Sequence, residues 1–64
     1  MRTVFQDGPY RGWFGSNEER RMHIHVQRDR QVCKIWLEPY VEYAKEGNFS
    51  NTELRKILEV VKKS

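Results

Sequence analysis

Two histidines two residues apart, His23 and His25, are the first candidates for chemistry in this sequence. On a β-strand, residues at this spacing point to the same side, so the two imidazoles could supply two metal ligands. Zinc takes four protein ligands in a structural site and three in a catalytic one. Cys33 falls on the opposite side of the predicted sheet, and Glu38 shares the histidine side only near the far end of its strand. We therefore predict no metal site and no bound cofactor.

The sequence offers little for covalent or acid–base catalysis. Cys33 has no histidine on its predicted side, and a lone buried cysteine usually acts as a small hydrophobic residue. The sequence contains no glycine-rich phosphate loop, no paired catalytic acids and no hydrolase motif. We do not expect an enzyme, and we assign no catalytic residues. A single cysteine also cannot form an internal disulfide, which indicates a reducing, cytoplasmic environment.

A group of aromatic and basic residues is the stronger candidate for a site. Alternation places six of them on one face of the predicted sheet: Arg11, Trp13, His23, His25, Lys34 and Trp36. Two tryptophans among cations are unusual for a surface that stays in water. Three interpretations are open: residues Pro39–Glu46 half cover the tryptophans, the face binds a protein, or the face binds nucleic acid. Tryptophan and arginine dominate protein interfaces, whereas an aromatic and basic sheet can stack bases and contact phosphates.

The element that positions these residues is a β-hairpin predicted over residues 23–38, with Asp29 and Arg30 at its tip. Apolar and polar residues alternate on both sides of the tip, which is typical of strands that bury one face. Closing the hairpin at this tip sets four opposed pairs: Val26 with Cys33, Ile24 with Ile35, His25 with Lys34, and His23 with Trp36. This register keeps the apolar residues of both strands on one face.

Two shorter strands are predicted before this hairpin, over Thr3–Gln6 and Tyr10–Gly15. Asp7–Gly8, between them, is a strong two-residue turn signal because both residue types tolerate positive φ. With the turn at these two residues, Phe5 lies opposite Tyr10 on the neighbouring strand.

Two further segments are ambiguous. Ser16–Arg21 is predicted as a solvated loop, although Ser16 and Glu19 have the spacing of a capping box and allow a single helical turn. Pro39–Glu46 alternates apolar and charged residues as a strand does, yet several of its residues suit a helix, and proline is acceptable at a first helical position. Because the segment is short and ends at Gly47–Asn48, we predict a bent extension of the fourth strand.

The last predicted element is an amphipathic helix from about Asn51 to Lys63. Ser50 and Glu53 have the spacing of a capping box, in which each side chain satisfies the other residue's free backbone N–H. The helix carries an apolar stripe of Leu54, Ile57, Leu58 and Val61. The sheet offers it an apolar face of Phe14, Ile24, Val26, Cys33, Ile35 and Leu37. The sequence therefore predicts an α+β fold, with a small antiparallel sheet of three to four strands and a C-terminal helix packed on one face.

Size and composition indicate one small domain over residues 1–64. The residues are 38% hydrophobic, the net charge is +3, and basic residues are spread along the chain. This mild charge permits contact with nucleic acid without requiring it. No apolar run approaches the roughly 20 residues of a membrane span, and the first ten residues lack the apolar stretch of a signal peptide. We therefore expect a cytoplasmic protein that does not enter a membrane.

Four short motifs, in this order, resemble the bacterial proteins grouped as domain of unknown function 4160 (DUF4160). They are SNE, HIHV, WLEP and FSNTEL, and with their flanking residues they cover nearly the whole chain. Gly12 and Gly15 stand where the family tends to have aromatic residues, and Arg21–Met22 replaces prolines before His23. Family members commonly continue with another apolar segment after the helix, which this sequence lacks, so a core shared with a partner is expected.

The resemblance implies little about activity, because the family is uncharacterised. Its members are often encoded beside another small protein of unknown function, an arrangement suggestive of toxin–antitoxin pairs. We therefore expect a small interaction module that binds a partner protein or a second copy of itself through the six aromatic and basic residues. The alternative is a nucleic-acid-binding module that uses the same face.

Overall fold

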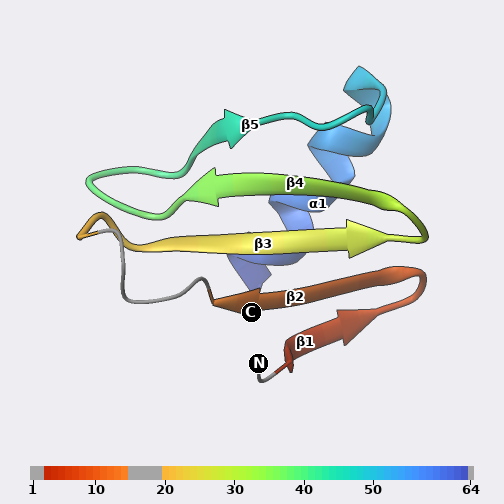
Figure 1. Ribbon diagram of the computed structural model, residues 1–64, viewed down its shortest axis with the longest axis horizontal. Helices are drawn as coiled ribbons and strands as arrows, with labels where there is room; N and C mark the ends of the chain where they lie inside the picture. Colours follow the sequence, from red (N-terminus) through yellow and green to blue (C-terminus); the bar gives the residue numbers. More distant parts are fainter. Residues whose placement is uncertain (1–2, 15–19, 64) are drawn as a thin grey trace.

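The computed structural model describes residues 3–14 and 20–63, which form an antiparallel sheet of five strands with one helix packed across one face (Figure 1). The elements are β1 (Thr3–Asp7), β2 (Tyr10–Phe14), β3 (His23–Arg28), β4 (Gln31–Trp36), β5 (Glu42–Lys45) and α1 (Asn51–Lys63). The order of the strands in the sheet is their order in the chain. The α+β class is confirmed, whereas the predicted number of strands was too small. The capping box considered for Ser16 and Glu19 lies outside the described residues.

The central hairpin of β3 and β4 has the predicted register throughout. His23 pairs with Trp36, and the next three pairs follow in step to Val26 with Cys33. Asp29 at the tip has a φ of 55°, a conformation that Asp and Asn adopt more readily than most residues. Alternation and turn chemistry therefore agree, and together they determine which residues reach each face of the sheet.

The hairpin of β1 and β2 turns one residue later than predicted. Asp7 pairs with Tyr10 and Phe5 pairs with Gly12, so the predicted pairing of Phe5 with Tyr10 was wrong. Gly8 occupies the first position of the turn with a φ of 58°, and Pro9 takes the second, where its fixed φ is acceptable. The Phe5 ring lies directly over Gly12, where an added Cβ would come within 2.2 Å of Phe5 Cε2. Gly12 thus leaves the space that the aromatic ring fills.

The segment Pro39–Glu46 forms a strand of its own instead of extending the fourth strand. The chain reverses after β4, the Glu38–Pro39 peptide bond is cis, and β5 runs antiparallel to β4. The register shifts between Lys34 and Ile35, whose partners are Lys45 and Tyr43. This bulge interrupts the alternation of β5, which explains why the sequence pattern was ambiguous.

The core lies between the sheet and α1, whose bounds match the prediction. Its buried members are Tyr10, Ile24, Val26, Cys33, Ile35, Phe49, Leu54, Ile57 and Val61. Ile35 and Ile57 are fully buried, whereas Leu58 is only partly so. Phe14 lies on the predicted face but remains 50% exposed. In the described part of the chain, no helix is long and apolar enough to cross a membrane.

Ser50 caps the start of α1, as predicted. The backbone N–H of Glu53 donates a hydrogen bond to Ser50 Oγ at 3.3 Å. The Ser50→Ala variant is therefore expected to lose about 1 kcal/mol of unfolding free energy, measured by urea denaturation. Ser50→Asp is the control, because aspartate caps equally well and its charge suits the N-terminus of a helix. Equal stability of the alanine variant and the original chain would contradict this role.

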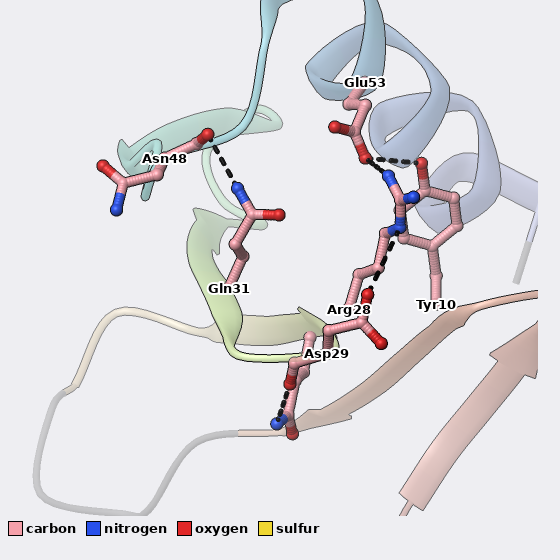
Figure 2. Close-up of polar contacts among 7 residues, drawn as sticks. Tyr10, Arg28, Asp29, Gln31, Asn48 and Glu53 are labelled. Carbon is pink, nitrogen blue, oxygen red and sulfur yellow. Dashed lines mark hydrogen bonds and ion pairs between the residues drawn. The ribbon is translucent and has the colours of Figure 1, made fainter.

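The carboxylate of Glu53 does not complete the capping box. It accepts hydrogen bonds from the Tyr10 hydroxyl, at 3.2 Å, and from the Arg28 guanidinium (Figure 2). These contacts join the first turn of α1 to β2 and β3. Nearby, the Gln31 side chain donates to the Asn48 carbonyl at 2.7 Å. The start of the helix is thus held to the sheet by polar contacts as well as by the core.

Candidate functional site

The sheet has a helix-free face, which we define as the side opposite α1. The strand register brings all six predicted site residues to this face. Trp13 pairs with His25, His25 with Lys34, and His23 with Trp36. Arg11 lies two residues before Trp13 on β2, so it shares the same side. The predicted grouping of these side chains on one face is therefore observed.

Four aromatic rings form a continuous row across the middle of the helix-free face, which we call the ring row. Trp13 stacks on His25 with ring centroids 5.5 Å apart. His25 meets His23 edge to face at 5.2 Å, and His23 meets Trp36 in the same way at 5.6 Å. Such contacts stabilise each ring beyond its burial. The ring row is consequently an ordered surface spanning three strands.

Cations lie over the tryptophans at both ends of the ring row. The Arg11 guanidinium is 5.5 Å from the centre of Trp13, and both Arg21 and Lys34 are 4.6 Å from the centre of Trp36. These distances are within the range of cation–π attraction. Arg21 was missed at the sequence level because it was assigned to the predicted loop Ser16–Arg21, although it lies two residues before His23 and so continues the alternation.

Arg21 is held by two further contacts beside Trp36. Its Nε donates to the Glu38 carbonyl at 2.7 Å, and its Nη2 pairs with the Glu42 carboxylate at 2.9 Å. Glu42 reaches this position because β5 places it opposite Trp36. The segment Pro39–Glu46 therefore lies beside Trp36 within the sheet, and the contacts over the ring come from Arg21 and Lys34. Both tryptophans are partly buried, and this segment is next to Trp36 but separated from Trp13 by β3 and β4.

The two histidines are engaged in the ring row. His23 is only 6% exposed, and its Nδ1 lies 3.1 Å from the Arg21 carbonyl oxygen, a contact in which the ring N–H donates. Cys33 is on the other face of the sheet, as predicted, so it cannot join the histidines. Among the described residues, no group of three or more metal-ligating side chains is found.

Cys33 is poorly suited to act as a nucleophile. It is buried in the core, and this burial raises the pKa of its thiol from 9.0 to about 11. The reactive form of cysteine is the thiolate, so at neutral pH this side chain remains an unreactive thiol.

Comparison with known proteins identifies a family without assigning an activity. No curated protein and no solved structure is found to match this chain. Residues 10–64 match the family described as Domain of unknown function (DUF4160). The match spans β2 to α1, including every residue of the ring row. The chain therefore belongs to the DUF4160 family.

Proposed function

We propose that this chain is an interaction module that binds a partner protein through the helix-free face. The observation that carries the proposal is the ring row with its cations, in which Arg11, Arg21 and Lys34 lie over two tryptophans. Tryptophan and arginine are enriched among residues that contribute most to protein binding. Side chains that are already ordered lose less conformational freedom on association, which favours affinity.

The chemistry of the face favours an acidic partner. Arg11, Arg21, Lys34 and Lys45 lie on or beside the ring row, while Glu42 opposes them with one carboxylate. A partner with acidic groups around an apolar or aromatic centre would complement this pattern. The excess of positive charge is expected to raise the rate of association at low salt.

The same geometry makes base stacking less favourable. Trp36 is contacted by two cations, and Trp13 by Arg11 and His25. A base that stacked on either indole would have to displace one of these groups. Glu42 adds negative charge beside Trp36, where a phosphate would be repelled. We therefore place protein binding ahead of nucleic-acid binding.

Replacing Trp36 by alanine is expected to weaken partner binding about thirtyfold, because loss of a central interface residue costs about 2 kcal/mol or more. We propose that the partner is a small protein encoded beside this chain, as in a toxin–antitoxin pair, and such a neighbour is the first probe. Affinity is measured by calorimetry with purified chains. Lys56→Ala, on the exposed side of α1, is the control and should bind normally. Unchanged binding of Trp36→Ala to a partner that binds the original chain would contradict the proposal.

A labelled single-stranded oligonucleotide separates the two binding classes. Nucleic-acid binding would appear at about 50 mM salt and fall steeply as salt is added, because bound counterions are released from the phosphates. Arg11→Ala and Lys34→Ala would then each weaken binding and flatten the salt dependence. That result, together with no effect of Trp36→Ala on protein binding, would replace the proposed function with the nucleic-acid alternative.

A further inference from the structure

The edge strand β5 places one lysine opposite another. Lys45 lies directly opposite Lys34 in the ladder between β4 and β5. Like charges at opposed positions destabilise a sheet. The outer side of β5 is the edge of the sheet, with no further strand beside it among the described residues (Figure 1). An acidic group placed on that outer side next to Lys45 would offset the repulsion.

The sequence of β5, Glu-Tyr-Ala-Lys, is complementary to itself when it runs antiparallel. Aligning two copies about the centre of the strand pairs Glu42 with Lys45 of the second copy, and Lys45 with Glu42 of the second copy. Opposed residues of an antiparallel pair point to the same face. Glu42 and Lys45 both lie on the helix-free face, because their partners in β4 are Trp36 and Lys34. Both new pairs would therefore bring opposite charges together on one surface.

We propose that β5 pairs antiparallel with β5 of a second copy, which joins two sheets about a two-fold axis. The axis stands perpendicular to the sheet, so both helices lie on one side of the joined sheet and both ring rows on the other. Glu42 would then lie between Arg21, to which it is already paired at 2.9 Å, and Lys45 of the second copy. The interface is a sheet-edge addition with a fixed register.

The helix side of β5 also fits a second copy. A groove beside this strand is lined by Tyr43, Glu46, Asn51, Leu54, Arg55 and Leu58. Tyr43 is fixed there by a hydrogen bond from its hydroxyl to the Leu54 carbonyl, at 2.6 Å. In the proposed register Tyr43 lies opposite Ala44 of the second copy. The second copy would narrow this groove and shield its apolar wall from water.

Short length and charge at β5 limit the assembly to two copies. Exposed edges are often protected from uncontrolled pairing by few residues and by lysine, and β5 has four residues and a lysine at its end. A two-fold contact uses the β5 edge of each chain once and leaves no β5 edge free. The inference does not depend on the proposed function of the helix-free face.

Charge reversal at the two positions tests the proposal by sedimentation equilibrium, from about 10 µM to about 1 mM protein. The original chain should show a reversible equilibrium between monomer and dimer. Glu42→Lys and Lys45→Glu should each raise the dimer dissociation constant about tenfold or more, since two attractive pairs become repulsive. An equimolar mixture of the two variants should form a heterodimer as stable as the original dimer, because its opposed charges are again opposite.

The double variant, E42K with K45E, should also recover the original dissociation constant. Lys56→Glu on the exposed side of α1 makes the same charge change away from β5 and should dimerise normally. Far-ultraviolet circular dichroism checks that each variant is folded. A single variant that does not fold leaves the double variant as the test. A monomer at every concentration, equal dimerisation of all variants, or failure of both the mixture and the double variant to recover would each overturn the proposal.

Discussion

Replacement of Ile57 by alanine is expected to leave much of the chain unfolded at room temperature. Ile57 is fully buried in the middle of the face that α1 turns to the sheet. Removing such a side chain costs about 2–5 kcal/mol, from lost burial and from the cavity that remains. A core of this size rarely supplies more than about 3–5 kcal/mol in total. One substitution therefore removes most of the available stability, and urea denaturation followed by circular dichroism would measure it.

Leu58→Ala is the matched comparison for Ile57→Ala. Leu58 is adjacent on the helix but only partly buried, so its truncation removes less contact and should cost clearly less. Helix propensity changes by a similar small amount in both variants. Equal effects of the two substitutions would show that α1 is not packed on the sheet in the observed orientation.

Raising the pH from about 8 to about 11 is expected to destabilise the fold strongly. Burial raises the pKa of Cys33 from 9.0 to about 11. Burial also raises the pKa of Tyr43, and the pKa of Tyr10 is raised by burial and by the Glu53 carboxylate. All three groups are neutral when protonated, and the folded chain holds these protons more tightly. The stability that these three protonated groups contribute to the fold is complete below about pH 9. It falls at higher pH, because the groups ionise in the unfolded chain before they ionise in the folded chain.

The urea midpoint measured at several pH values checks this expectation. The urea midpoint should begin to fall near pH 9, where a cysteine in the unfolded chain ionises. It should fall more steeply near pH 10, where tyrosines in the unfolded chain ionise. Tyr43→Phe should flatten only the part above about pH 10, and Cys33→Ala the part that starts near pH 9. The ultraviolet absorbance of thiolate and phenolate follows the same ionisations directly. A constant urea midpoint across this range would contradict the burial of these groups.

The centre of the fold could be predicted because several local signals agree there. Between His23 and Trp36 the alternation, the turn at Asp29 and the apolar face all specify one register, and the observed pairs follow it. The six candidate site residues were placed on one face for the same reason. The bounds of α1 were also predictable, since Ser50 caps a helix with an uninterrupted apolar stripe.

The remaining features depend on contacts between distant residues. Phe5 pairs with Gly12 because the turn is formed by Gly8 and Pro9. Turn propensity alone does not distinguish this turn from one formed by Asp7 and Gly8. The strand β5 was hidden by the bulge at Ala44, which interrupts the period of two. Its absence from the prediction also removed Glu42 from the expected site.

The other contacts that the sequence did not predict join residues far apart in the chain. Glu53 has the spacing of a capping box with Ser50, yet its carboxylate contacts Tyr10, 43 positions away. Arg21 reaches Trp36 and Glu42 across two turns of the chain. Such contacts follow from the assembled sheet, and local patterns carry no signal for them.

The agreement between strand order and chain order has a consequence for synthesis on the ribosome. Each strand can pair with the one before it as soon as it emerges, because every pairing joins consecutive strands. The apolar side of that growing sheet, including Ile24, Val26 and Ile35, is covered only when α1 follows. Until then the nascent chain displays a hydrophobic surface with unpaired edges, the kind of species that chaperones bind and that aggregates. A chain truncated before residue 51 is therefore expected to be the form most prone to aggregate.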